Sequence, residues 1–196
     1  MVGMSVSPDF NSVGIKNSKS ATARIGVYVY YNVMPGWYLS TGLLYSNKKY
    51  NASGEYYFPG NNYWKRKTNG ILPDNVTGSC RVIDIPLLVS YRVLQKERIS
   101  LMLTSGISSY LLQDEIYDFE FEQENPDAVD SWKTTDNSMT PFSIGNISLG
   151  IEAPVSKRLF LVLEPYIKLP LKDIGWGHIR LYSSGVQLNI KYRLWK

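Results

Sequence analysis

The residues best suited to chemistry lie late in the chain. His178 is the sole histidine, and Asp173, Ser183 and Ser184 lie close to it in the sequence. These residue types could act as nucleophile, base and orienting acid, provided that their side chains come within hydrogen-bonding distance. Because no motif fixes that geometry, we expect an exposed histidine and no catalytic residue.

Side chains that bind metals are few. A single cysteine, Cys80, and a single histidine exclude an internal disulfide framework, an all-cysteine cage and the multi-histidine zinc motifs. We expect Cys80 to be a plain cysteine at a rim rather than a reactive thiol. A group of carboxylates could offer oxygen ligands to calcium, but it lacks the glycine and turn of an EF-hand, so we expect a solvated acidic loop, no metal and no cofactor. These carboxylates are Asp114, Glu115, Glu120, Glu122 and Glu124.

One segment combines aromatic and basic side chains and is the best candidate for contact with another molecule. Aromatic faces and cations together suit glycans, lipopolysaccharide or a protein partner. A structured loop that packs on itself would show the same composition. The candidate contact residues are Tyr57, Phe58, Tyr63, Trp64, Lys65 and Arg66.

The chain as a whole has the size of one domain. It has 196 residues, of which 44% are hydrophobic and 19% charged, and 15 are tyrosine. Such a composition excludes a disordered chain and favours short strands joined by turns. No window of 18 uncharged apolar residues occurs, so we expect no membrane-spanning helix, but a spanning barrel with alternating strands of about 10 residues stays open.

Hydrophobic residues recur at every second position along most of the chain. Residues Ala23, Ile25, Val27, Val29 and Tyr31, for example, would share one face of a strand. Eight runs of this kind predict an all-β fold, an eight-stranded antiparallel up-and-down transmembrane β-barrel. The runs are 2–6, 21–33, 37–46, 82–93, 99–111, 146–153, 159–169 and 182–194.

The connections between these runs alternate between short and long. Short links at 34–36, 94–98 and 154–158 predict tight turns at one end of the barrel. Outer-membrane barrels have short periplasmic turns and longer extracellular loops, so we expect one domain over 1–196 with both termini periplasmic. The predicted long loops lie near 9–20, 50–79, 113–140 and 172–178.

The two faces of the predicted strands differ in charge, and all charges fall on one face. Alternation alone leaves two arrangements open: a membrane barrel with the charges inside, or a soluble lipocalin-like carrier with an apolar lumen. In a membrane barrel the charged residues would form an ion-pair network that fills a narrow lumen, which argues against a general porin. The predicted network contains Arg24, Asp84, Arg92, Glu152, Glu164, Lys168 and Lys191.

Two features favour the membrane arrangement. Small residues such as Gly26, Gly42, Gly106, Gly150 and Gly185 share the charged face, as expected inside a narrow barrel. Aromatic residues on the apolar face lie toward the two ends of the strands, as in the interfacial girdles of membrane barrels. The predicted girdle residues are Tyr31, Trp37, Tyr45, Tyr91, Tyr182 and Tyr192.

Several strand segments carry a family resemblance. The stretches R-V-I-D-I-P-L-L-V-S-Y-R-V at 81–93, G-I-S-S-Y-L-L at 106–112 and L-F-L-V-L-E-P-Y-I-K-L-P-L at 159–171 resemble the PorT-like outer-membrane β-barrels of Bacteroidota. The opening V-S-P-D-F at 6–10 is similar to the C-terminal barrel of dual-membrane-spanning anti-sigma factors. That resemblance implies a bacterial outer-membrane location and, for the anti-sigma factors, a periplasmic linker before the barrel.

Taken together, the sequence predicts a non-catalytic integral outer-membrane barrel that serves as a membrane anchor or interaction module. Its expected partners are outer-membrane lipid and a protein bound through the long loops or through a part preceding Met1. The net charge of +4 is dispersed, so we expect no nucleic-acid partner. The alternatives are the lipocalin-like carrier of an apolar ligand and a lipid-modifying outer-membrane enzyme that uses His178.

Overall fold

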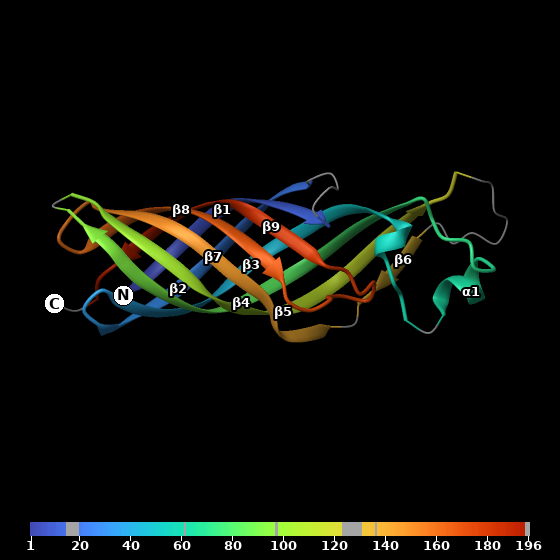
Figure 1. The fold of residues 1–196 in the computed structure, drawn as a ribbon, viewed down its shortest axis with the longest axis horizontal. Helices are drawn as coiled ribbons and strands as arrows, with labels where there is room; N and C mark the ends of the chain where they lie inside the picture. The colour runs from blue at the N-terminus through green and yellow to red at the C-terminus, as the bar shows by residue number, and fades with distance from the viewer. Residues whose placement is uncertain (15–19, 61, 97, 123–130, 136, 195–196) are drawn as a thin grey trace.

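The computed structural model describes residues 1–14, 20–60, 62–96, 98–122, 131–135 and 137–194. Its strands run the length of an elongated barrel, and a short helix lies beyond one end (Figure 1). Among these residues, no helix is long and apolar enough to cross a membrane. The strands are β1 Val2–Val13, β2 Ser20–Met34, β3 Trp37–Ser53, β4 Asn75–Gln95, β5 Ser100–Glu120, β6 Ser131–Thr134, β7 Ser138–Pro154, β8 Leu159–Pro170 and β9 Leu181–Tyr192, and the helices are η1 Gly54–Tyr56 and α1 Tyr63–Lys67.

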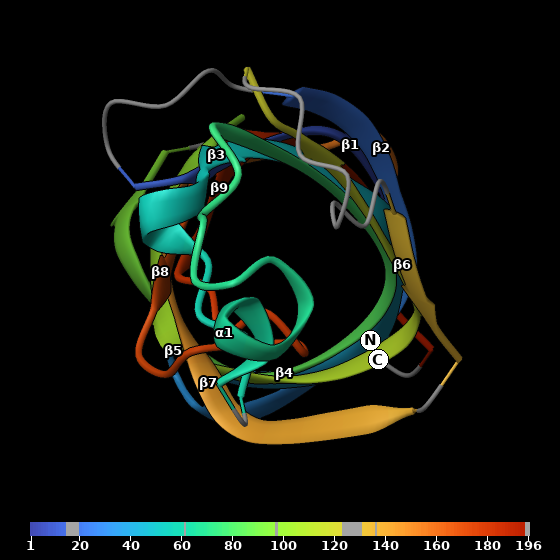
Figure 2. The same ribbon diagram turned by 90° about the vertical axis from the view of Figure 1, so that its right-hand side faces the viewer.

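The sheet closes on itself, and all its pairings are antiparallel. Sequence neighbours pair around the wall, and β9 completes it by pairing with β1, from Val2 opposite Tyr192 to Val13 opposite Leu181. Strand β6 is a short addition that pairs with β5 alone within the described part of the chain. Viewed from the helix end, the strands form a closed ring (Figure 2). The predicted eight-stranded up-and-down barrel is therefore confirmed.

Tight turns join the strands at the end where both chain termini lie (Figure 1). The β2–β3 turn passes through Pro35 and Gly36, and Gly36 has a φ of +83°, which favours glycine because it lacks a Cβ. The predicted short links thus lie together at one end. At the other end, α1 lies across the mouth of the barrel (Figure 2).

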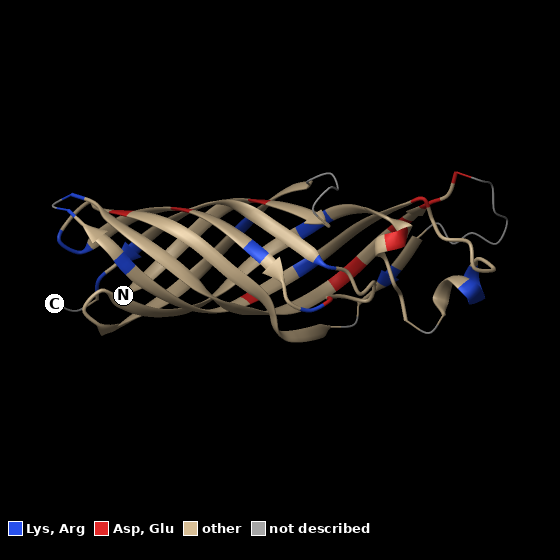
Figure 3. Ribbon diagram, in the orientation of Figure 1, with Lys and Arg blue, Asp and Glu red and all other residues tan. Residues whose placement is uncertain are grey.

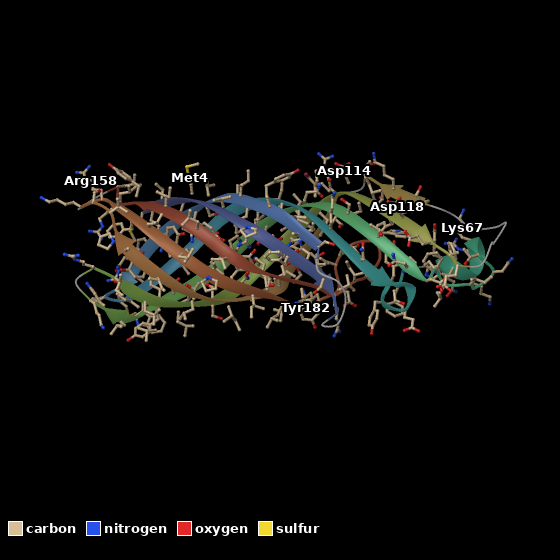
Figure 4. The ribbon with its side chains drawn as sticks, turned by 90° about the horizontal axis from the view of Figure 1, so that it is seen from above. Met4, Lys67, Asp114, Asp118, Arg158 and Tyr182 are labelled. Carbon is tan, nitrogen blue, oxygen red and sulfur yellow. The ribbon has the colours of Figure 1, made fainter. Side chains whose placement is uncertain are left out.

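The middle of the barrel is apolar outside and polar inside. Leu149, Leu161 and Leu188 are exposed on the outer surface, while Asn189 and Lys191 are buried in the lumen. Side chains project outward along the whole wall, as Met4 does in Figure 4. This exterior suits a band of hydrocarbon about 25 Å thick. The lipocalin-like alternative, which needs an apolar lumen and a polar exterior, is therefore wrong.

Two glycines of the predicted inner face lie where a Cβ would overlap the backbone of the neighbouring strand. A Cβ on Gly42 would overlap the Val27 carbonyl oxygen and crowd the Tyr28 ring, and a Cβ on Gly106 would overlap the Leu87 carbonyl oxygen. Gly150 differs, because a Cβ there would meet its nearest neighbour at an ordinary 3.4 Å. The small residues thus indicated the inward face of the strands correctly, although not every one of these positions requires glycine.

Several strands continue beyond the apolar band, into segments predicted to be long loops. Within 9–20, 50–79 and 113–140, the structure extends β1, β3, β4, β5 and β7, although parts of these segments lie outside the described residues. The alternation of inward and outward side chains continues there, but its polarity is reversed: Tyr50 and Val76 are buried inside, whereas Lys49 and Arg81 are exposed outside. Water replaces lipid around this part, so polar residues belong outside and apolar ones inside. The segment 172–178 is a connection whose Ile174 makes an isolated bridge to Ile179.

Candidate functional site: the charged lumen and its cap

The first group of lumen charges lies toward the end with the tight turns. Glu152 on β7 is buried and pairs with Lys191 of β9 at 3.1 Å and with Arg92 of β4 at 3.6 Å. The Arg92 guanidinium also donates to the Tyr38 hydroxyl, and the Lys191 ammonium lies 4.5 Å from the centroid of the Tyr30 ring. One carboxylate therefore holds two cations, and the tyrosines provide further favourable contacts for both.

The second group centres on Asp84 in β4. Lys168 of β8 donates to Asp84 at 2.6 Å, and Arg24 of β2 lies 4.0 Å from the same carboxylate oxygen. The Arg24 guanidinium also donates to Gln187 and stacks 4.1 Å from the centroid of the Tyr166 ring. Side chains from three non-adjacent strands thus meet inside the barrel and link its walls.

The third group joins Lys48 of β3 to Asp9 of β1, and the sequence analysis missed it. The Lys48 ammonium lies 2.7 Å from Asp9 and also donates to Asn11 and Ser183 at 2.9 Å. Tyr166 donates to the other Asp9 oxygen at 2.7 Å. Both charged side chains are fully buried. The alternation contained the signal, because Asp9 follows Ser5 and Ser7 at the same two-residue spacing.

Glu164 lies in the lumen but departs from the predicted ion-pair network. It accepts hydrogen bonds from Ser148 and from Asn189, and no ion pair involves it in the part of the chain that the structure describes. Glu164 lines a cavity of about 40 Å³ together with Tyr28 and Thr104. A space of this size is far below the roughly 300–1,000 Å³ of a small-molecule pocket, so side chains occupy most of this part of the lumen.

An aromatic cluster closes the mouth of the barrel at the end that carries α1. Tyr57 lies at its centre, with its ring centroid 5.0 Å from that of Tyr117 and 6.0 Å from that of Trp64. Tyr63 packs edge-on against Trp176 at 4.9 Å. We call this group the cap, defined by Tyr57, Tyr63, Trp64, Tyr117, Phe119, Trp132 and Trp176.

Polar groups beneath the cap hold its connecting segments in place. Glu115 is buried and accepts hydrogen bonds from the Tyr117 hydroxyl and, at 2.9 Å, from the Trp176 backbone amide. Burial raises the pKa of the Tyr57 phenol well above its ordinary value. Cys80 lies beside Arg81, outside the apolar band, and burial raises the pKa of its thiol to about 12. At neutral pH this cysteine is therefore a thiol, which is a poor nucleophile.

The cap corrects the predicted contact loop. Tyr57, Tyr63 and Trp64 are buried within it, so they do not present their rings to a partner. They pack because the strands that rise above the membrane need an apolar core of their own. Phe58, Lys65 and Arg66, by contrast, are exposed on the outside of the cap.

The predicted girdle residues lie on the outer wall. Tyr31, Trp37 and Tyr91 are exposed near the tight turns, and the ring centroids of Trp37 and Tyr91 are 4.7 Å apart. Tyr192 and Tyr45 are exposed as well. Tyr182, labelled in Figure 4, is only partly exposed.

The residues considered for catalysis are not assembled into a triad. His178 and Asp173 are exposed, and Asp173 pairs with Arg180. Ser183 is buried in the lumen, where it donates to Asn11. No hydrogen bond connects His178 to Asp173 or Ser183 in the described ranges.

The predicted acidic loop is divided between two faces of β5. Asp114 pairs with Arg81 on the outside, whereas Glu115 points inward beneath the cap. Glu120 bonds to Asn75 on the outer surface, and Glu124 lies outside the described residues. Over the described ranges, no group of three or more His, Cys, Asp or Glu residues is arranged to hold a metal ion.

Comparison with known proteins identifies the class. A family model for the outer membrane protein beta-barrel domain matches residues 2–174, so the chain belongs to this family. An outer-membrane location follows from that membership and agrees with the apolar exterior. No curated protein sequence matches the chain.

Comparison with solved structures finds matches at low sequence identity, and the first of those that follow shares the fold. Neisserial surface protein A has a TM-score of 0.55 and 9% identity, with 97% of this chain and 96% of that chain covered. Ail, the attachment invasion locus protein of Yersinia pestis, has a TM-score of 0.48 and 9% identity over the same shares. The outer membrane protease OmpT from Escherichia coli has a TM-score of 0.43 and 11% identity, again over 97% and 96%.

The last of these structures corrects one expectation. We expected a barrel that is not an enzyme, yet a protease is among the structures that this chain resembles. The expectation was wrong as a deduction from the fold, because the fold does not exclude enzymatic activity.

The Lys48–Asp9 pair predicts a large effect of removing one partner. Lys48→Met leaves the Asp9 carboxylate buried without its ammonium, which should lower the free energy of unfolding by about 3–5 kcal/mol. Urea unfolding in detergent micelles measures the change. The double variant K48M/D9N should regain part of the loss, because it removes the unpaired charge.

The control for this variant is Arg180→Met. It breaks the exposed pair with Asp173 and should cost less than about 1 kcal/mol. Equal losses for Lys48→Met and Arg180→Met would contradict the proposed importance of the buried pair.

The cap predicts a local effect at Gly177. A Cβ there would overlap the Tyr57 ring, so Gly177→Ala should loosen the cap and raise its cleavage rate in limited proteolysis roughly tenfold. Gly60→Ala is the matched control, since a Cβ at Gly60 meets no heavy atom within 4 Å. The barrel should stay folded in both variants, as judged by heat-modifiable gel mobility. Unchanged cleavage in Gly177→Ala would mean that the cap is not tightly packed.

Proposed function

We propose that this outer-membrane barrel is a membrane anchor and an interaction module that presents a rigid head at one end. The head is the part beyond the apolar band, which contains η1, α1, β6 and the cap. The observation that carries the proposal is the packing of the interior: three ion-paired groups fill the lumen and the aromatic cap covers its mouth. A barrel packed in this way does not conduct solutes, and it can hold an attached segment at a fixed position in the membrane. Its outward-facing parts are then the surfaces available for function.

The head offers a compact surface for a partner. Helix α1 lies at its tip, where Lys67 is labelled in Figure 4, and Lys65 and Arg66 are exposed beside it. Phe58 and Ile71 are exposed large apolar side chains on the segments that flank the helix. Exposed aromatic and aliphatic side chains next to cations suit a protein partner or an anionic glycan.

The proposed orientation places the head outside the cell and both termini in the periplasm. Two observations support it: the tight turns and both termini share one end, and the strands extend far beyond the apolar band only at the other end. Membrane barrels of bacteria place short turns on the periplasmic side.

The anti-sigma arrangement is the most specific form of this proposal. The resemblance of 6–10, 81–93 and 159–171 to PorT-like barrels and to the barrels of dual-membrane-spanning anti-sigma factors supports it. In that arrangement the barrel fixes one end of a periplasmic linker in the outer membrane. The gene sequence upstream of Met1 tests it, since a sigma-binding domain and a transmembrane helix are required there.

A closed lumen predicts no general solute channel. Vesicles that contain the folded protein should not swell in isotonic arabinose, and planar bilayers should show no stable conductance steps, because the lumen is blocked by paired side chains. A large porin serves as the positive control. Sustained conductance by the wild-type barrel would contradict the anchor proposal.

The proposed orientation predicts opposite reactivities for cysteines placed at the two ends. A membrane-impermeant maleimide added to intact cells should label Lys65→Cys in the head but not Lys157→Cys in a tight turn. The native Cys80 is buried and should give little background. Permeabilised cells provide the control in which both introduced cysteines react. Labelling of Lys157→Cys in intact cells would overturn the orientation.

A further inference from the structure

Basic side chains gather around the end that carries the tight turns. Figure 3 shows them as blue segments at the end where both termini lie, and Arg158 is labelled there in Figure 4. They come from the β4–β5 turn, the β7–β8 turn and the end of β9, which are consecutive around the wall, so they belong to one side of the ring rather than to one loop. We call them the basic rim; they are Lys96, Arg98, Lys157, Arg158 and Arg193, and all are exposed.

No exposed carboxylate balances the basic rim among the residues that the structure describes. Glu152 is the nearest described acid along β7, but it is buried and already holds Lys191 and Arg92. Glu97 lies between two rim residues in the sequence and outside the described ranges. Even with Glu97 counted, the five cations of the rim outnumber this acid, so the rim carries net positive charge that can attract an external anion.

The opposite end of the barrel differs. Its exposed cations are partly paired, Arg81 with Asp114 and Arg180 with Asp173. Exposed acids such as Asp118, labelled in Figure 4, lie among them. That end also carries Lys65, Arg66 and Lys67 in α1, so it combines charges of both signs, whereas the described exposed charges at the end with the tight turns are all positive.

The basic rim adjoins side chains suited to lipid. Leu94, Ile99 and Val155 are exposed large apolar residues in or beside the same turns. Arg193 is fixed against the wall: its backbone amide donates to the Arg158 carbonyl oxygen at 2.8 Å, and its guanidinium lies 4.8 Å from the centroid of the Phe160 ring. Apolar residues continuous with the lipid-facing band, bordered by cations, match the boundary between acyl chains and headgroups.

We propose that the basic rim binds the phosphate groups of anionic phospholipids in the adjoining leaflet. Arginine and lysine attract phosphate, and arginine also binds it through two hydrogen bonds at once. A barrel held in this way would resist tilting and vertical movement. This binding does not depend on the orientation proposed above. With that orientation, the adjoining leaflet is the one that faces the periplasm.

The test measures lipid preference at this end of the barrel. Trp37 is exposed on the outer wall at the start of β3 and pairs with Tyr91 of β4, the strand that leads into the turn with Lys96 and Arg98, so its fluorescence responds to brominated lipids at that side of the barrel. In vesicles that contain brominated phosphatidylglycerol or brominated phosphatidylcholine, wild-type protein should favour the anionic lipid about fivefold or more. The variant K96Q/R98Q/K157Q/R158Q should lose this preference. Trp37→Phe gives the signal from the other tryptophans for subtraction.

The matched control neutralises cations at the other end. K65Q/R66Q/K67Q should keep the wild-type preference, and heat-modifiable mobility should show that both variants are folded. The proposal is overturned if the rim variant keeps the preference, or if the control loses it equally. It also fails if wild-type protein shows no preference for the anionic lipid. If, in that case, the substitutions in the rim variant alone convert a dimer to a monomer in native mass spectrometry, the rim contacts a second copy of the chain instead.

Discussion

The structure depends on the pairing of charges that are enclosed in a wall surrounded by hydrocarbon. Neither water nor lipid can satisfy these groups, so each needs a partner from another strand. Asp84 meets Lys168 and Arg24, and Lys48 meets Asp9, in each case between strands that are not neighbours in the wall. The pairs both neutralise charge and connect separate strands of the wall. The resulting interior is stiff and closed, which makes this barrel better suited to holding a position than to passing a solute.

A change of solvent along the barrel axis explains its two-part construction. Where lipid surrounds the wall, apolar residues face out and polar residues face in. Where water surrounds it, the same strands carry Lys49 and Arg81 outside and bury Tyr50 and Val76. The aromatic cap is the core of this second part. It gives the head an ordered shape, and it removes Tyr57 and its neighbours from the surface available to a partner.

The two ends of the barrel therefore offer different chemistry. The head combines exposed apolar side chains with charges of both signs, as a partner-binding surface does. The other end has short turns, unbalanced cations and apolar residues that continue the lipid-facing band. An anchor benefits from this asymmetry, because one end can be fixed to a leaflet while the other presents a rigid surface. Barrels of one architecture serve several functions, so the fold does not exclude a catalytic role for the head.

From the residues alone, the strand segments within the apolar band, the tight turns and the inward face that carries Arg24, Asp84 and Lys191 could be predicted, because a two-residue period and the cost of charge in lipid are local properties of the chain. The closed fold was needed to show that Lys48 pairs with Asp9, that Glu164 has hydrogen bonds and no ion pair in the described chain, and that Tyr57 is buried. These contacts join strands far apart in sequence, so they depend on the register of the closed wall. The alternation also continues beyond the membrane with its polarity reversed. The sequence pattern of a strand does not indicate at which residue the surrounding lipid gives way to water.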